Sequence, residues 1–274
     1  NHRLLTPPPQ HIRYVQCDLT DLDAVRGLFE RESIDVVLHT AALLPDLSPN
    51  YDERTVSANV TATVNLAATA REAGCSRFVF CSSVSVYGTT ADSNLLSEEA
   101  PTSPEDVYAW SKVVGEQYVE MCCSKQGMTG ISLRLSGLHG QGRRGGVFFN
   151  VVQSAISGAP IQIASSHAPF QFLNLIDAVE AARWAVFMPS DSVQAHIAIN
   201  VASGIVSSLH DIATLALSMS EFNVPIVVSE GDSARCQLMN TKQFDSWRNW
   251  HLRDTAETLK SIFAWLQQMK GHSK

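Results

Sequence analysis

Short apolar runs alternate along this chain with longer segments whose apolar residues recur every three or four positions. The runs at 12–17, 34–40, 78–81 and 131–135 have the length and the β-branched and aromatic content of buried strands. The segments between them have the period of helices, at about 22–32, 53–73 and 107–125. This order of strands and helices predicts an α/β fold with a doubly wound, parallel, Rossmann-like sheet.

The pattern becomes less regular after residue 140 and predicts a smaller α+β lobe. We therefore divide the chain into a dinucleotide-binding domain, 1–140, and a mainly substrate-binding lobe, 141–274, from which segments around 170–201 return to the first domain. The elements expected in this part are helices at 147–157, 177–187, 209–219 and 255–269, and strands at 161–164, 170–175, 196–201 and 225–228.

Composition narrows the class of partner. The chain has 274 residues, a formal charge of −7 and no basic run, which argues against nucleic acid and anionic membranes and favours a small-molecule substrate. No apolar run approaches the roughly 18 residues of a membrane span, and no signal peptide is visible, so a cytoplasmic location is expected. The six cysteines show no metal-type spacing and are expected to be reduced thiols, and no metal site is predicted.

One stretch has residues suited to catalysis. Ser82 and Ser83 follow the strand at 78–81, and open α/β sheets bind ligands at the carboxyl ends of their strands. Tyr108 and Lys112 lie four residues apart and so share one face of the next helix. A nearby ammonium favours the phenolate, and we expect it to lower the pKa of Tyr108 so that this residue can shuttle a proton. Alone, the pair would more often be part of an ordinary helix surface.

These residues belong to two short sequence motifs. They are Ser82-Ser83-Val84-Ser85-Val86-Tyr87-Gly88 and Tyr108-Ala109-Trp110-Ser111-Lys112, with the serine and tyrosine separated by 108 − 83 = 25 residues. Both motifs and their separation resemble the extended short-chain dehydrogenases/reductases, the NAD-dependent epimerase/dehydratase group that includes UDP-galactose 4-epimerase. The resemblance covers nearly the whole chain, but it begins inside the family's domain.

The resemblance implies an enzyme that transfers hydride reversibly at a hydroxyl of a sugar, which can be a nucleotide sugar, or at another secondary alcohol. It assigns catalysis to Ser83, Tyr108 and Lys112, with NAD as the cofactor and NADP not excluded. It also implies a homodimer formed through the helices at about 53–73 and 107–125. The residues that it places against the cofactor are Asp18, Leu19, Ala41, Ala42, Asn59, Ser82, Tyr108, Lys112, Leu135 and Leu138.

The residues themselves leave some of these assignments open. Asp18 could simply belong to the cap of the helix at 22–32, and Asn59, in the middle of a helix, could be solvated. The basic loop at 141–146 could face an anionic substrate or only solvent.

Other positions depart from the sugar-nucleotide members of the family. Phe170 stands where many carry an arginine that grips the diphosphate, and Gly137 stands where the best-known epimerase has an asparagine, so a UDP-sugar is in doubt. Dehydratase members carry Asp-Glu after the catalytic serine or threonine. Here these positions are Val84 and Ser85, which cannot exchange protons in water elimination, so dehydration is disfavoured.

The largest departure is the missing Gly-x-x-Gly-x-x-Gly turn, which should precede Asp18 and hold the pyrophosphate. We expect that about 45 residues of a parent chain, the size of its opening strands and helix, precede this sequence. The 274-residue chain without them is then expected to be inactive. The alternative is a non-catalytic dinucleotide-binding or interaction protein of the same fold, or an inactive fragment.

Overall fold

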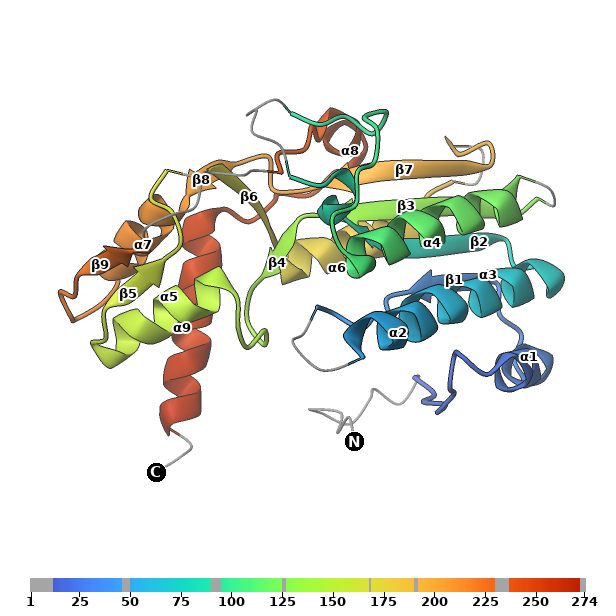
Figure 1. The fold of residues 1–274 in the computed structure, drawn as a ribbon, viewed down its shortest axis with the longest axis horizontal. Coiled ribbons are helices and arrows are strands. Elements are labelled where there is room, and N and C mark those ends of the chain that lie inside the picture. Colours follow the sequence, from blue (N-terminus) through green and yellow to red (C-terminus); the bar gives the residue numbers. More distant parts are fainter. Residues whose placement is uncertain are drawn as a thin grey trace.

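Four parallel strands form the main sheet of the computed structural model, which describes residues 12–45, 50–89, 95–124, 127–167, 169–189, 192–229 and 237–271. Their order is β1-β2-β3-β7, and the carboxyl ends of the strands face the second lobe (Figure 1). The strands are β1 (Val36–His39), β2 (Arg77–Ser83), β3 (Thr129–Leu135) and β7 (His196–Val201). The predicted α/β class and parallel sheet are confirmed.

Helices cover both faces of this sheet. The near face in Figure 1 carries α3 (Ala62–Glu72) and α4 (Val107–Cys123), and the far face carries α6 (Leu175–Phe187). Strand β2 shows why both faces are covered, because alternate side chains of a strand point to opposite sides. Phe78 and Phe80 join the core against α3 and α4, whereas Val79 joins the core against α6.

The position of α4 depends on one small residue. A Cβ placed on Gly115 would lie 2.6 Å from the ring of Phe80, so only glycine permits this close approach of helix and strand. At its first turn, α4 is capped by Asp106, whose side chain accepts a hydrogen bond from the backbone N–H of Ala109. Gly115 and the cap together place Tyr108, in the first turn, close to the end of β2.

The second lobe has its own core. A three-stranded sheet, β4-β6-β8, and a two-stranded sheet, β5-β9, pack with three helices around buried residues such as Phe148, Ile161, Ile212 and Ile262. The strands are β4 (Gly137–His139), β5 (Ile161–Ile163), β6 (Pro169–Asn174), β8 (Val206–Ser208) and β9 (Ile226–Val228), and the helices are α5 (Val147–Ser157), α7 (Leu209–Ser218) and α9 (Thr255–Gly271). Strand β4 follows β3 after one residue, so the two lobes meet at the end of β3.

Some predicted elements were wrong or incomplete. Residues 12–17 form no strand, because within the described residues β1 pairs only with β2, and Ile12 and Tyr14 are exposed. Helix α1 (Leu22–Arg31) follows as expected. The helix predicted at 53–73 comprises α2 (Tyr51–Thr55), a π-helical turn (Val56–Thr61) and α3. The sequence did not reveal β4, β8 or α8 (Lys242–Trp247), which are only three to six residues long.

Two further predictions concern the environment of the chain. Cysteines in the described segments are all unpaired, in agreement with reduced thiols; these are Cys17, Cys75, Cys81, Cys122 and Cys123, and Cys236 lies outside these segments. None of the helices in the described segments has the length and apolar character that crossing a membrane requires.

Candidate active site

A cavity of about 540 Å³ lies at the carboxyl ends of β1, β2 and β3, where an open α/β sheet binds its ligands. We call it the strand-end cavity. Its wall includes apolar side chains from the segments after all three strands, among them Leu44, Val84 and Leu138. The residues that line it are Thr40, Ala42, Leu44, Pro45, Cys81, Ser82, Ser83, Val84, Tyr108, Lys112, Leu135, Ser136, Gly137, Leu138 and Arg143.

The three predicted catalytic residues all line this cavity. Ser83 ends β2, and its Oγ accepts hydrogen bonds from the backbone N–H and the hydroxyl of Ser85. A further hydrogen bond joins Ser83 to the hydroxyl of Tyr108. Lys112 lies one turn further along α4, with its Nζ 5.6 Å from the centre of the Tyr108 ring. The structure therefore brings these three residues together, as their spacing in the sequence predicts.

Lys112 is almost completely buried and points toward the end of β2. Its Nζ donates a hydrogen bond of 2.8 Å to the carbonyl oxygen of Cys81 and lies 4.9 Å from the centre of the Phe80 ring. Burial lowers the pKa of Lys112 to about 8, although Glu116 favours its charged form. At neutral pH the site therefore still has an ammonium group.

The prediction that Lys112 lowers the pKa of Tyr108 was wrong for this structure. The pKa of Tyr108 lies above its ordinary value, because burial disfavours the phenolate more strongly than the hydrogen bond with Ser83 favours it. The ammonium of Lys112 donates to the Cys81 carbonyl and is directed at the strand end. Tyr108 is therefore a neutral phenol at pH 7, which is the form that can donate a proton.

Asn59 is buried and not solvated, in contrast to the interpretation based on its position in a helix. Its side chain accepts a hydrogen bond from the Leu43 N–H and donates to the Leu43 carbonyl and to the Ser111 hydroxyl. The Ser111 hydroxyl in turn donates to the carbonyl of Tyr108. Asn59 lies in the π-helical turn, a feature often found at functional sites. It ties the segment after β1 to the first turn of α4.

The other residues predicted to contact the cofactor divide into two groups. Ala42, Ser82, Leu135 and Leu138 line the strand-end cavity, whereas Asp18, Leu19, Ala41 and Asn59 do not. The exposed carboxylate of Asp18 accepts hydrogen bonds from the backbone and hydroxyl of Thr20, and the cap of α1 is Asp21. Direct contacts of these residues with a cofactor stay predictions.

Sequence reasoning missed a buried polar network behind the site. Glu116, one turn after Lys112, accepts a hydrogen bond of 2.5 Å from the hydroxyl of Ser82 and pairs with Arg134 at 2.7 Å. Arg134 also donates to the hydroxyl of Tyr87 and to the carbonyl of Glu98. In the sequence, Glu116 is marked only by its place four residues after Lys112. Its partners Ser82 and Arg134 lie on β2 and β3, so the spacing within the helix does not reveal them.

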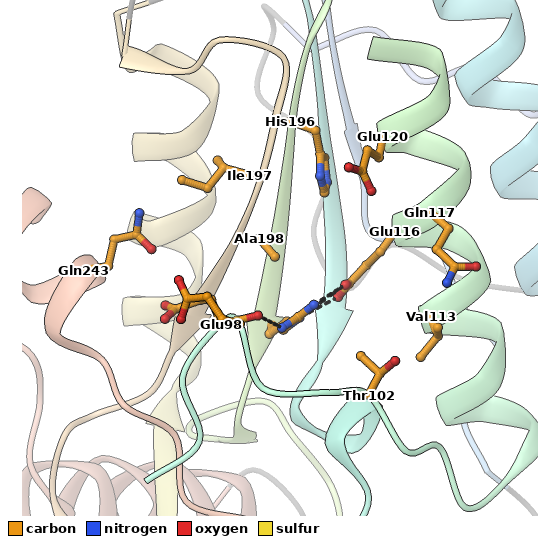
Figure 2. Close-up of a pocket in the computed structure, with 12 residues that line it drawn as sticks. Glu98, Thr102, Val113, Glu116, Gln117, Glu120, His196, Ile197, Ala198 and Gln243 are labelled. Atoms are coloured by element: carbon orange, nitrogen blue, oxygen red, sulfur yellow. Dashed lines mark hydrogen bonds and ion pairs between the residues drawn. The ribbon is translucent and has the colours of Figure 1, made fainter. Parts of the chain in front are cut away.

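The Glu116–Arg134 pair forms part of the wall of a second pocket of about 370 Å³ between α4 and β7. Figure 2 shows Glu116 reaching from α4 into this pocket, with Glu120 and His196 further along it. The Glu116 carboxylate pairs there with the guanidinium of Arg134. Ser82 lines the strand-end cavity, and Glu116 lines the second pocket. The hydrogen bond between them therefore connects the walls of the two pockets. This network holds the end of β2 against α4.

The residues of the strand-end cavity fit the nicotinamide riboside half of a dinucleotide. Ala42 leaves room for close approach, and Lys112 has three donors, of which one is used in the hydrogen bond to Cys81. The hydroxyl of Ser136 is buried without a partner among the described residues. The pyrophosphate half is different, since residues 1–18 contain no glycine from which a phosphate-binding turn could be made.

Comparison with known proteins agrees with this geometry. The sequence profile of the NAD dependent epimerase/dehydratase family matches residues 2–202. The mouse dTDP-D-glucose 4,6-dehydratase is 34% identical over 132 residues, which cover 48% of this chain and 37% of that enzyme. The 3-beta-hydroxysteroid dehydrogenase of Mycolicibacterium neoaurum is 32% identical over 165 residues, covering 57% and 44%. The chain thus spans less than half the length of these curated relatives.

Solved structures share the fold over almost the whole chain. The Bordetella bronchiseptica enzyme WbmG in complex with NAD has a TM-score of 0.80 and 21% identity, covering 96% of this chain and 81% of its own. The UDP-glucose 4-epimerase of Thermotoga maritima with UDP-glucose has a TM-score of 0.81 and 17% identity, covering 94% and 84%. The shared fold and the match of residues 2–202 to the family profile together confirm the predicted family.

Removal of the Glu116 carboxylate should destabilise the protein strongly. In Glu116→Ala the guanidinium of Arg134 stays buried without its counter-ion, and breaking one side of a buried ion pair costs about 3–5 kcal/mol. Urea denaturation of the variant and the wild type measures this loss. The matched control is Glu180→Ala, which breaks the exposed pair with Arg183 and should cost no more than about 1 kcal/mol. Equal losses in both variants would contradict a structural role for the buried pair.

Proposed function

Because the chain belongs to the NAD-dependent epimerase/dehydratase family, we propose that the protein catalyses reversible hydride transfer between NAD and a secondary alcohol of a small molecule. The observation that supports this proposal is the meeting of Ser83, Tyr108 and Lys112 in one cavity at the ends of the strands. NAD supplies the hydride acceptor when it is bound. The residues of this chain have the following proposed roles in the reaction.

Tyr108 exchanges the proton of the reacting oxygen. Its hydroxyl is hydrogen-bonded to Ser83, so both groups can hold one substrate oxygen between them. The neutral phenol donates a proton when a carbonyl is reduced and recovers it when an alcohol is oxidised. Lys112 holds its ammonium 5.6 Å from the centre of the Tyr108 ring and donates to the Cys81 carbonyl, so it fixes the end of β2 beside Tyr108. The apolar side chains of Val84, Leu135 and Leu138 line the same cavity.

Oxidoreduction or epimerisation fits this site better than dehydration. Val84 lines the cavity with an apolar side chain, and Ser85 donates its hydroxyl to Ser83. Neither position has the carboxyl group that water elimination requires, although one relative is a dehydratase of dTDP-D-glucose. Relatives acting on steroids show that a substrate of this family need not carry a phosphate. We therefore propose a sugar or another secondary alcohol as the substrate class.

Tyr108→Phe in the natural full-length chain should lose turnover by about 10²–10⁴-fold, the range that general acid–base steps contribute. The affinity for NAD should change little, since only one hydroxyl is removed. Tyr118→Phe, on the same helix but outside the cavity, is the control and should keep its activity. Steady-state kinetics and calorimetric titration measure both quantities, and full turnover by Tyr108→Phe would refute the assigned role.

We also propose that the residues of this chain do not by themselves hold the pyrophosphate of the dinucleotide. The proposal rests on the missing glycine turn and on the outer edge of β1, which is unpaired within the described residues and leaves Leu38 41% exposed. Backbone N–H groups of such a turn would hold the pyrophosphate.

The 274-residue chain alone should therefore bind NAD poorly, whereas a chain extended upstream to include a Gly-x-x-Gly-x-x-Gly turn should bind it. Isothermal titration of NAD and NADP into both chains measures the difference. Micromolar binding by the short chain would contradict the proposal. A natural chain without that turn would instead favour a non-catalytic protein of this fold.

We propose, finally, a homodimer through the outer faces of α3 and α4, which lie side by side in Figure 1. Trp110, Met121 and Val56 expose apolar side chains on this side, Met121 to 59%. Met121→Glu should weaken a dimer because it places a charge in the interface. Sedimentation velocity measures the result, with Val179→Glu, on the exposed face of α6, as the matched control. An unchanged sedimentation coefficient for Met121→Glu would place any dimer interface elsewhere.

A further inference from the structure

A groove between α5 and α9 lies in the second lobe, apart from the site described above. The two helices lie side by side in Figure 1, and their buried residues belong to the core of this lobe. Beside that core a cavity of about 440 Å³ remains, which we call the α5–α9 groove. Among the described residues, none lines both this groove and the strand-end cavity.

Half-buried apolar side chains form most of the wall of the groove. Phe149 and Ile156 come from α5, and Leu266 and Met269 come from α9. Ile156 and Leu266 also pack against the buried core of the lobe. The ring of Phe149 lies 6.2 Å from the ring of Trp265. Ligand pockets typically have such apolar walls with a few polar groups, and volumes of about 300–1,000 Å³, so the groove has the size and the lining of a binding site.

Arg144 brings a positive charge to this apolar wall. Its side chain is exposed, and its guanidinium contacts the sulfur of Met269 at 3.9 Å. Within the described part of the chain, it has no carboxylate partner. Many other arginines of these segments do pair with carboxylates; they are Arg13, Arg26, Arg71, Arg134, Arg183, Arg248 and Arg253. The groove therefore offers guanidinium donors that can still take an anionic acceptor.

The basic loop at 141–146, whose role the sequence left open, contributes to two cavities. Arg143 lines the strand-end cavity and donates to the carbonyl of Leu138, whereas Arg144 lines the α5–α9 groove. Gly142 and Gly145, on either side of the two arginines, have φ angles of +92° and +110°, which glycine adopts without strain. This loop conformation gives each cavity one arginine, so Arg144 belongs to the groove.

These features define the chemistry of a matching ligand. A carboxylate supplies the planar anionic acceptor that a guanidinium can bind through two hydrogen bonds. An apolar chain attached to the carboxylate would cover the half-buried side chains and remove them from water. The described lining of the groove contains no acidic residue that would repel such an anion. A cationic or wholly polar molecule would leave either the guanidinium or the apolar wall unmatched.

We propose that the α5–α9 groove binds a small amphiphilic carboxylate, with its apolar chain against Phe149, Ile156 and Leu266 and its head group on the guanidinium of Arg144. Because the groove is separate from the strand-end cavity, this inference does not depend on the proposed function. Octanoate and decanoate are suitable probes, since they share the head group and differ only in the length of the chain.

The experiment titrates both probes, below the concentrations at which they form micelles, into the natural full-length chain carrying ¹³C in its methionine methyl groups. Met269 lines the groove, and its signal is assigned with Met269→Leu. The signal should shift and saturate as the groove fills, and isothermal titration gives the affinity. Decanoate should bind about four- to fifteenfold more tightly than octanoate, because two further methylenes leave water.

Two variants test the two halves of the site. Arg144→Gln should weaken the binding of decanoate about three- to tenfold, the range of one hydrogen bond, and Arg144→Lys should retain more of the affinity. Gln153→Trp, at an exposed position on the groove wall, places a large ring in the groove and should weaken both probes. Arg183→Gln removes an equal charge from the exposed surface of α6 and should bind as the wild type does.

Four results would overturn the proposal. The first is a Met269 signal that does not respond to either probe. The second is equal affinity for octanoate and decanoate, which would exclude contact with the apolar wall. The third is unchanged binding by Arg144→Gln, or an equal loss in Arg183→Gln, which would mean that Arg144 does not hold the head group. The fourth is a Met269 signal that shifts with protein concentration in the absence of probe, which would show that a second copy of the chain fills the groove.

Discussion

The close docking of α4 on β2 determines the geometry of the site. Three residues within about one turn of α4 make this contact: the Lys112 ammonium bonds the Cys81 carbonyl, Gly115 lets the Phe80 ring approach, and Glu116 accepts from Ser82. Each contact is specific for its residue, since a Cβ at position 115 would separate helix and strand. Tyr108, one turn before Lys112, is thereby carried to the end of β2, where Ser83 is located. Ser83 and Tyr108 are therefore positioned by the packing of α4 on β2 and by the buried hydrogen bonds between this helix and this strand.

Burial then sets the charges of the site. It lowers the pKa of Lys112 to about 8 and raises the pKa of Tyr108, so at neutral pH the site contains an ammonium beside a neutral phenol. Glu116 lies on the side of Lys112 away from Tyr108 and is itself neutralised by Arg134. Because Arg134 pairs with it, the Glu116 carboxylate can remain buried one turn from Lys112. The pairing also weakens the electrostatic effect of this carboxylate on the rest of the site. The arrangement favours donation of a proton from Tyr108 to an oxygen held with Ser83.

The strand-end cavity is also the joint between the two lobes. Strand β3 carries Arg134 of the buried network and ends at Leu135, Ser136 follows, and β4 begins the second lobe at Gly137. A ligand at the strand ends therefore touches residues whose positions are set by both cores. In the second lobe Phe170 stacks on Phe172, and both rings pack against the core of that lobe.

The sequence by itself determined the elements whose signals are local and pointed to the candidate catalytic residues that meet in the strand-end cavity. Apolar periodicity predicted the strands at 34–40, 78–81 and 131–135 and the helix at 107–125, because each reflects burial of one face of one segment. The spacing of Tyr108 and Lys112 placed them on one helix face for the same reason. Only the tertiary structure decided what depends on partners distant in the chain. Residues 12–17 have a strand's composition but no strand partner within the described segments. Asn59 is buried by contacts with Leu43 and Ser111, and the raised pKa of Tyr108 follows from burial. Composition cannot show such effects, because desolvation and hydrogen-bond satisfaction depend on which surfaces the folded chain brings together.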